Sequence, residues 1–306
     1  MARRGVLVRD FIREALCGEG GYFCGAASPV LAAPKTLPFR EFRGAADYRR
    51  ALGDIYARGA GFATPCEIFA PWYSYAVARW ALAWHRRDGA AAAARGRAAP
   101  PLRVVEFGGG TGAHAAHFLD FAREAAPAAY VACRYVGVDA SPAMRSRFLE
   151  RLDRRGHGGV ADAVAGDAAG AWALPPGFGD GPATVVGLEL LDNLPHDKVV
   201  WREGGACDEV RVDGRDEVAA PAADAWVLRA AALAAPRAAG AEFVPTCVEI
   251  KHWFGGSPPN FRTLYLDQIE VDSADFLTNR WLSWSSRSTA EQSGAIRSIT
   301  RSLKSG

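Results

Sequence analysis

The sequence lacks a strong net charge and a long apolar run. Its 306 residues include 36 lysine and arginine residues against 34 aspartate and glutamate residues, which gives a formal net charge of +2. This balance offers no support for nucleic-acid binding or for attachment to a membrane surface. No uninterrupted stretch of about 18 apolar residues occurs, so we expect no membrane span.

The sequence also lacks closely spaced metal ligands. Its six cysteines stand at positions 17, 24, 66, 133, 207 and 247, and none forms a Cys-x-x-Cys pair or a zinc-like cluster with histidine. We therefore expect reduced, mostly buried thiols in an intracellular protein. His114 and His117 are one helical turn apart, but no third ligand is evident, so we expect no bound metal.

About half of the residues are apolar, which is enough for a full core in one large domain or two small ones. The N-terminus has no apolar signal-peptide core. Asp10, Glu14 and Glu19 follow its arginines closely, so we expect no transit peptide within this chain.

Composition and periodicity divide the chain into three parts. We expect an N-terminal helical extension or lid over 1–98, with an Ala/Gly/Arg/Pro-rich linker at 89–101. An α/β domain should occupy 99–270, and 271–306 should form a poorly ordered or diverged tail.

The extension should contain helices over 6–23, 45–58 and 65–84. Thr64, Pro65 and Glu67 have the order of an N-cap, a first helical residue and the partner of a capping box. Pro71 should kink this third helix or mark a later start.

Beyond the linker, strands and helices alternate. The expected strands are 102–107, 133–139, 160–165 and 183–189, and helices at 112–125 and 141–154 lie between them. This alternation predicts a mostly parallel, doubly wound sheet. An antiparallel hairpin at 198–213, a helix at 219–240 and a strand at 242–250 should follow.

The stretch VVEFGGGTG at 104–112 combines a strand, a glycine-dense turn and a helix start. The carboxyl ends of parallel strands and the N-termini of the following helices are where adenosyl and phosphate ligands bind. Gly108, Gly110 and Ala113 satisfy the dinucleotide fingerprint, which leaves an NAD-linked enzyme as one alternative.

Glu106 favours another ligand, because it begins the pattern E-x-G-x-G-x-G through Gly108, Gly110 and Gly112. A carboxylate at this place would repel a bound pyrophosphate. It suits a cationic ligand without phosphate, such as S-adenosyl-L-methionine, which carries a sulfonium and an ammonium.

Acidic residues also follow the three later strands. Asp139 ends the second strand, where a carboxylate can accept both ribose hydroxyls. Asp167 and Ala168 follow the third strand, where they could meet the adenine amino group. Glu189 and Asp192 end the fourth, where paired carboxylates could bind a guanidinium next to the transferred methyl.

Together these motifs resemble the MidA-like methyltransferases, a family that includes the mitochondrial complex I assembly-factor type of protein-arginine methyltransferase. The plant and algal branch is the most similar. The resemblance covers residues 8–202 and is carried by RDFIREALCGEGGYF, FATPCEIFAPWYSYAVARW, VVEFGGGTG, VGVDASPAMR and LELLDNLPHDKVVW.

The resemblance implies a Rossmann-like class I methyltransferase that modifies an arginine on a complex I subunit in mitochondria. It places Glu106, Gly108, Gly110 and Gly112 on the cofactor loop and Asp139 on the ribose. Glu189 and Asp192 fall on the family's acidic segment Asn-Glu-x-x-Asp-x-x-Pro. Leu188 departs from the asparagine of that segment, and the chain after about residue 255 does not match the family.

The departures after residue 255 motivate a second alternative. A chain that keeps the methyltransferase fold but lacks its later strands could be a catalytically inactive module for binding or assembly.

Overall fold

The structure is a computed structural model that describes residues 5–24, 37–57, 63–170, 172–179, 181–202, 206–234, 247–251 and 261–265. The predicted tail at 271–306 lies outside these ranges. So do 242–246 of the predicted strand and 235–240 of the predicted Ala-rich helix.

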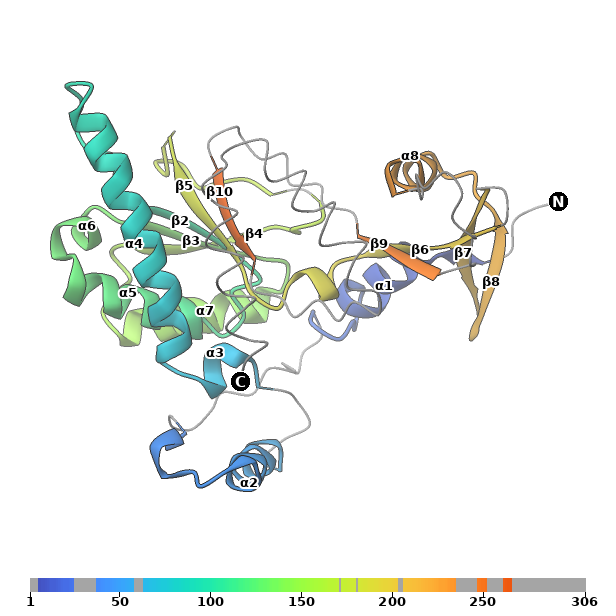
Figure 1. Cartoon of the computed structure of the whole chain (residues 1–306), viewed down its shortest axis with the longest axis horizontal. Coiled ribbons are helices and arrows are strands. Elements are labelled where there is room, and N and C mark those ends of the chain that lie inside the picture. Colours follow the sequence, from blue (N-terminus) through green and yellow to red (C-terminus); the bar gives the residue numbers. More distant parts are fainter. Residues whose placement is uncertain are drawn as a thin grey trace, which may run out of the picture. The chain divides into compact units, whose positions relative to one another are not determined.

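The main feature is a five-stranded parallel sheet (Figure 1). Its members are β2 (Arg103–Phe107), β3 (Arg134–Asp139), β4 (Ala161–Ala165), β5 (Ala183–Gly187) and β10 (Phe261–Tyr265). The spatial order is β10-β5-β2-β3-β4, and every pair is parallel. The predicted Rossmann-like α/β fold is therefore confirmed.

The strand order reverses between β2 and β5. From β2 the chain moves outward through β3 to β4, then returns to place β5 on the other side of β2. Glu106 stands opposite Gly137 on one neighbour and Val186 on the other. Ligands of open α/β sheets bind at the carboxyl ends of the strands at such a switch point.

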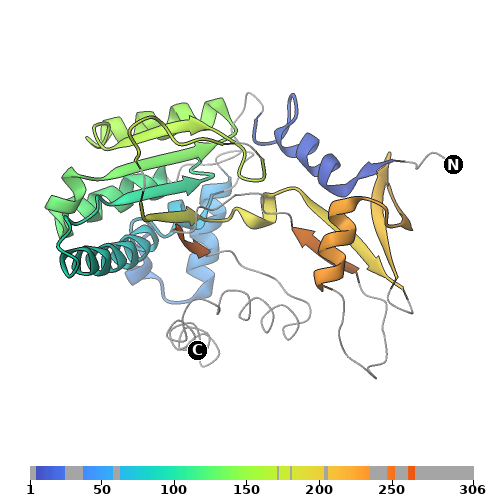
Figure 2. The same cartoon turned by 90° about the horizontal axis from the view of Figure 1, so that it is seen from above.

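Helices cover one face of this sheet (Figure 2). They are α4 (Trp72–Ala93), α5 (Ala113–Ala125) and α7 (Pro142–Arg154). Their residues Leu82, Phe118 and Phe148 pack on Val104 and Tyr135. Burial of each such side chain stabilises the folded state by roughly 1.5–3 kcal/mol. Since Leu82 of α4 packs on the sheet in this way, α4 belongs to the core of the α/β domain.

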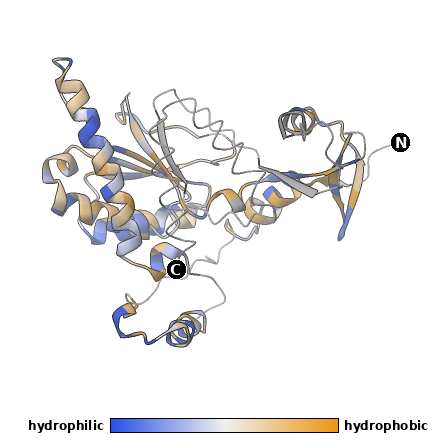
Figure 3. Ribbon diagram, in the orientation of Figure 1, coloured by the Kyte–Doolittle hydropathy of each residue, from blue (hydrophilic) through white to orange (hydrophobic). Residues whose placement is uncertain are grey.

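The opposite face is formed by the alternate residues of the same strands. Val105 and Val136 pack there with Phe178 and Trp172, which come from the segment between β4 and β5. In Figure 3, α4 and α5 carry both hydrophobic and hydrophilic residues. Period-two alternation in the strands thus divides the core into two layers.

A second, antiparallel sheet was only partly foreseen. It contains β1 (Val6–Leu7), β6 (His196–Trp201), β7 (Cys207–Asp213), β8 (Asp216–Pro221) and β9 (Cys247–Lys251). The pairing of β6 with β7 confirms the predicted hairpin, although residues 203–205 at its turn are not among those described.

Several predicted helix boundaries are wrong. Residues 6–23 form β1, α1 (Val8–Cys17) and a turn, since Val6 and Leu7 pair with β7. The predicted helix at 219–240 begins only at α8 (Ala225–Ala234), because 219–221 pair within β8. The helix at 45–58 is confirmed as α2 (Ala45–Tyr56). Short helices not predicted are η1 (Phe39–Glu41), α6 (Pro127–Val131) and η2 (Leu191–Asn193).

The predicted helix at 65–84 is two helices. The first, α3 (Pro65–Ile68), ends before Pro71, and α4 starts after that proline. Thr64 makes no side-chain capping bond, and Glu67 contacts other elements of the fold. The capping box is therefore wrong, although Pro65 does begin a helix.

The predicted linker at 89–101 is also wrong in its first part. Helix α4 continues to Ala93 and includes Gly89. Alanine has the highest helix propensity, and the run of alanines at 90–94 outweighs the single glycine.

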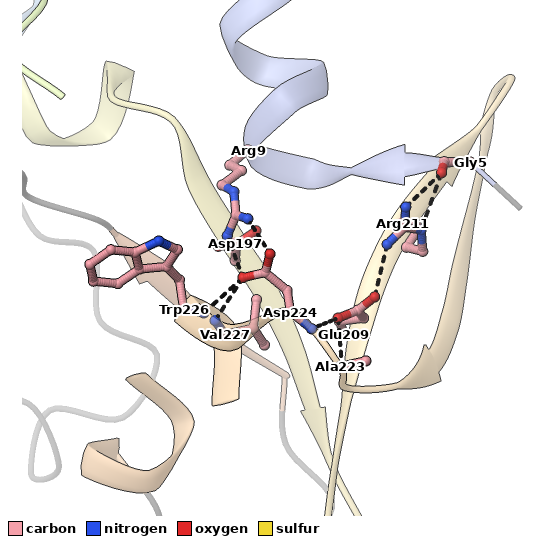
Figure 4. A network of polar contacts seen from close by, with 9 residues as sticks. All are labelled: Gly5, Arg9, Asp197, Glu209, Arg211, Ala223, Asp224, Trp226 and Val227. Carbon is pink, nitrogen blue, oxygen red and sulfur yellow. Dashed lines mark hydrogen bonds and ion pairs between the residues drawn. The ribbon is translucent and has the colours of Figure 1, made fainter. Parts of the chain in front are cut away.

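Arg9 fastens α1 to the antiparallel sheet (Figure 4). Its guanidinium donates to Asp197 of β6 at 2.7 Å and to both carboxylate oxygens of Asp224 at 3.0 and 2.6 Å. Asp224 also accepts from the backbone N–H groups of Trp226 and Val227 at the start of α8. The hydrogen bond from Arg9 lowers the pKa of Asp224.

A second buried carboxylate continues this network. Glu209 of β7 accepts from Arg211 at 2.8 Å and from the N–H groups of Ala223 and Asp224 at 3.0 Å. Arg211 also donates to the carbonyl of Gly5. The N-terminal strand, β7 and the start of α8 are thereby joined through side chains far apart in the sequence.

We expect Arg9→Met to lower the free energy of unfolding by about 3 kcal/mol, because the Asp197 carboxylate is buried and would lose its guanidinium. The measurement is urea unfolding followed by circular dichroism. Arg50→Met is the control, since Arg50 pairs with Asp47 at the surface, where such pairs contribute less than about 1 kcal/mol. Equal effects of the two substitutions would contradict the expectation.

Candidate functional site

The glycine loop lies at the carboxyl end of β2. Gly108, Gly110 and Gly112 have φ values of 67°, 52° and 74°. These angles lie in the left-handed region, which glycine adopts without a steric penalty. The density of glycine in this segment is therefore a backbone requirement, and α5 begins directly after Gly112.

The loop packs closely against Phe148 at two of its glycines and borders free space at Gly110. A Cβ at Gly109 would lie 2.8 Å from the ring of Phe148, and one at Gly112 would lie 3.0 Å from the Cα of the same residue. At Gly110 the nearest atom to a Cβ would be the Gly108 carbonyl oxygen at 3.8 Å. The backbone at Gly110 thus borders space that a ligand can occupy.

Glu106 lies beneath the loop and is buried. Its carboxyl accepts a hydrogen bond from the Tyr135 hydroxyl at 2.9 Å. Burial raises the pKa of Glu106 to about 8, and the negative charge of Asp139 adds to this effect. At neutral pH the carboxyl is therefore largely protonated until a cation is placed nearby.

Asp139 stands where the sequence predicted it, at the end of β3 beside the glycine loop. One carboxylate oxygen accepts from the Gly110 N–H at 3.3 Å, and the other accepts from the Ser141 N–H at 2.8 Å. Ser141, not Asp139, caps helix α7. Burial raises the pKa of Asp139, and the two N–H groups oppose this shift.

Asp167 and Ala168 follow β4 as expected. Asp167 accepts from the Ala169 N–H at 2.8 Å, which forms a tight turn. Ala168 packs against the second core layer. The adenine contact predicted for these residues stays a prediction.

Glu189 lies in a loop after β5 and does not end the strand, which stops at Gly187. Among the described residues it is the one non-glycine residue with a positive φ, 53°. Its carbonyl accepts from the Asn193 side chain at 3.0 Å. A backbone strained in this way is retained where the surroundings hold it, often at a functional site.

Leu190 brings this acidic loop onto the glycine loop. A Cβ at Gly108 would lie 3.2 Å from Leu190 Cδ1, and one at Gly187 would lie 3.1 Å from its Cδ2. The two predicted parts of the site are therefore adjacent. Asp192 belongs to η2, but its side chain is outside the described part of the structure.

The sequence reasoning missed contributions from the N-terminal extension. Cys66 of α3 is buried, and burial together with the negative charges of Glu106, Glu67 and Glu189 raises the pKa of its thiol well above the usual value. Cys66 precedes Glu67, which contacts the glycine loop through Thr111. The available signal is the segment FATPCEIF, which predicts a helix start and carries part of the family resemblance but assigns no site residue.

Cys17 is exposed at the end of α1. Partial desolvation by neighbouring atoms raises the pKa of its thiol to about 12, and Cys24, Asp167 and Asp139 contribute further. The backbone N–H groups of Tyr22 and Phe23 donate to the carbonyls of Ala15 and Leu16, so the chain folds back beside α1.

Both histidines of the predicted pair lie on α5. His114 is buried, neither of its ring nitrogens has a hydrogen-bond partner in the described residues, and burial lowers its pKa to about 3. Within the described ranges, no three His, Cys, Asp or Glu side chains are grouped so that they could hold a metal ion. In the same part of the chain, no helix is sufficiently long and apolar to cross a membrane.

Comparison with known proteins agrees with this geometry. Residues 76–254 match the family described as "Putative S-adenosyl-L-methionine-dependent methyltransferase". The chain belongs to this family. No curated protein matches it.

A solved structure has the same fold. A protein of Burkholderia thailandensis, solved bound to S-adenosyl-homocysteine, is 24% identical and has a TM-score of 0.50. The match covers 76% of this chain and 49% of that protein. A native structure from the same organism is 22% identical with a TM-score of 0.46, and covers 81% of this chain and 50% of that one. The chain thus spans about half the length of these structural relatives.

The observed loop fits the cofactor that the family description names. Gly110 leaves its backbone open, Asp139 presents a carboxylate at the end of the adjacent strand, and Glu106 can supply negative charge below. None of these groups opposes a cationic ligand without phosphate.

We expect Gly112→Ala to lower the free energy of unfolding by about 2 kcal/mol or more, because the new Cβ would be in a left-handed backbone and against the backbone of Phe148. Gly214→Ala is the matched control: its φ is 66°, but no atom lies within 4 Å of the new Cβ. Urea unfolding of both variants measures the difference. A loss that is equal at the two positions would show that the contact with Phe148 contributes nothing.

Proposed function

We propose that this chain is an S-adenosyl-L-methionine-dependent methyltransferase that modifies an arginine side chain of a protein. The observation that carries the proposal is the position of two loops at the switch point of the parallel sheet, the glycine loop and the acidic loop, joined by Leu190. The glycine loop fits the cofactor, and the acidic loop would offer a carboxylate next to the cofactor.

The cofactor would lie along the carboxyl ends of β2, β3 and β4. Gly108, Gly110 and Gly112 would let it approach the backbone, and Asp139 would accept hydrogen bonds from the ribose hydroxyls. Asp167 and Ala168 would border the adenine. When bound, the cofactor supplies an electrophilic methyl group on its sulfonium.

Glu189 and Asp192 would act on the nucleophile. A guanidinium has a pKa above about 12, so it must lose a proton as it attacks the methyl. Two carboxylates can hold it by bidentate hydrogen bonds, localise its positive charge and direct the reacting nitrogen. Support for Glu189 comes from its strained backbone and its place in the acidic loop. The enzyme's main contribution would be positioning, which can lower a barrier by roughly 7–11 kcal/mol.

The proposed partner is a subunit of respiratory complex I, and the proposed location is the mitochondrion. Support comes from the resemblance of FATPCEIF and LELLDNLPHDKV to the segments of the assembly-factor type. The neutral overall charge of the chain agrees with a protein substrate better than with a nucleic acid.

We expect Glu189→Gln and Asp192→Asn to reduce methyl transfer by about 100-fold or more, because each removes a carboxylate that orients the guanidinium. Both variants should still bind S-adenosylhomocysteine. The measurement is transfer of a labelled methyl from S-adenosyl-L-methionine to complex I subunits, with mass spectrometry to locate methylarginine. Glu217→Gln is the control, because Glu217 is exposed on β8.

Three results would count against the proposal. Normal turnover by both variants would remove Glu189 and Asp192 from the mechanism. A methyl found on another type of side chain would overturn the arginine assignment. Binding of NADH in place of S-adenosylhomocysteine, measured by calorimetry, would favour the dinucleotide alternative.

We expect ligand binding to release protons at neutral pH. Burial raises the pKa of Glu106 to about 8 in the free protein. An ammonium group bound nearby will lower this pKa, because it favours the charged carboxylate over the protonated acid. The affinity for S-adenosylhomocysteine should therefore rise from about pH 6 to about pH 8 and level off above the pKa of the free protein. Calorimetry in phosphate and Tris, which differ in ionisation enthalpy, measures the protons released.

Glu106→Gln is the control for this linkage, because it keeps the size of the side chain and cannot titrate. Its binding enthalpy should be the same in both buffers. A wild-type enthalpy that is also independent of the buffer would show that Glu106 does not change its protonation on binding.

A further inference from the structure

Glu67 is a buried carboxylate that the proposed mechanism does not use. It lies on α3, in the N-terminal extension, and is 4% exposed. Its Oε1 accepts from the Thr111 hydroxyl at 2.7 Å and from Arg151 of α7 at 2.7 Å. One oxygen therefore connects the extension, the glycine loop and the helix that follows β3.

Thr111 is the only residue of the loop 108–112 with a side chain, since the other four are glycines. Glycine has the largest conformational freedom of any residue, so this loop loses much entropy when it is ordered. Phe148 packs closely against Gly109 and Gly112, but neither glycine has a side chain that could form a hydrogen bond. The Thr111 hydroxyl is thus the one side-chain group through which another element can hold the loop.

The contact with Glu67 is of the strong kind. Thr111 is buried, and hydrogen bonds to an ionised carboxylate are stronger than those between neutral groups. Arg151 forms an ion pair with the same carboxylate, with its Nη1 2.7 Å from Glu67 Oε1.

We propose that Glu67 is a positioning residue for the cofactor: with Arg151, it holds Thr111 so that the glycine loop is in its ligand-binding conformation before the cofactor arrives. A loop ordered in advance binds more tightly, because less entropy is lost on binding. This inference rests on the proposed function. It makes the N-terminal extension a part of the cofactor site through a residue that does not touch the cofactor.

The test is the affinity of the full chain for S-adenosylhomocysteine, measured by calorimetry at a temperature at which circular dichroism shows every variant to be folded. Glu67→Gln and Thr111→Val should each bind about tenfold more weakly. Thr111→Ser keeps the hydroxyl and should bind like the wild type. The double variant Glu67→Gln/Thr111→Val should be no weaker than the weaker single variant, because both changes break the same contact.

Two matched controls separate positioning from general stability. Thr184→Val removes another buried threonine hydroxyl, near the start of β5 and away from the carboxyl ends of the strands. Glu209→Gln changes another buried carboxylate that is paired with an arginine. Both should lower the urea midpoint of unfolding and leave the affinity for S-adenosylhomocysteine unchanged.

The outcomes distinguish the inference from the function on which it rests. A wild-type chain that binds no S-adenosylhomocysteine would overturn the proposed function and this inference with it. Wild-type binding together with unchanged affinity in Glu67→Gln and Thr111→Val, or with fully additive losses in the double variant, would overturn the inference alone. If Glu67→Gln does not fold, the comparison of Thr111→Val with Thr111→Ser decides.

Discussion

The packing of Phe148 against three glycines is the constraint on which the site depends. A Cβ at Gly109, Gly112 or Gly137 would come within 3.0 Å of this residue. Helix α7 can therefore lie close to β2 and β3 only because these positions carry no side chain. The same close approach fixes the bend from β2 into α5, and it leaves Gly110 as the open point of the loop. Ligand access and core packing thus follow from one contact.

Burial of carboxyl groups is the second organising feature. Glu106 and Asp139 both have raised pKa values because they are taken out of water, and each is close to the other. Such burial is unfavourable for the charged form, which a cationic ligand would relieve. Glu67, in contrast, is paired with Arg151 at 2.7 Å. The site therefore combines two kinds of carboxyl group. A cationic ligand would balance the charge of Glu106 and Asp139, whereas Glu67 is paired with Arg151 of the protein itself.

The N-terminal extension is tied to the rest of the described chain at both of its ends. Arg9 holds α1 to β6 and to the start of α8, and Glu67 holds α3 to the glycine loop. The bond between Glu67 and Thr111 thus brings a residue that precedes the glycine loop in the sequence onto that loop.

The sequence by itself determined the parallel sheet, the glycine loop and the position of Asp139, because each depends on local signals. Apolar strands that alternate with helices, a run of glycines and an acid at a strand end are each recognised from adjacent residues. Glycine density at 108–112 indicated a close approach to the backbone, and Phe148 makes such an approach at Gly109 and Gly112. Local reasoning predicted a capping box for Glu67, whereas its carboxylate contacts Thr111 and Arg151. A glutamate at this position suits either role, so the residue type alone could not decide between them.

Only the tertiary structure decided which of these residues act together. The pairing of Val6 and Leu7 with β7, the contact of Leu190 with Gly108, and the bonds of Glu67 to Thr111 and Arg151 join residues that are far apart in the chain. The positive φ of Glu189 has no signal in its residue type, since glutamate rarely adopts it. Such features arise when packing overrides local preference, because the energy of many buried contacts exceeds that of a single backbone angle or helix cap.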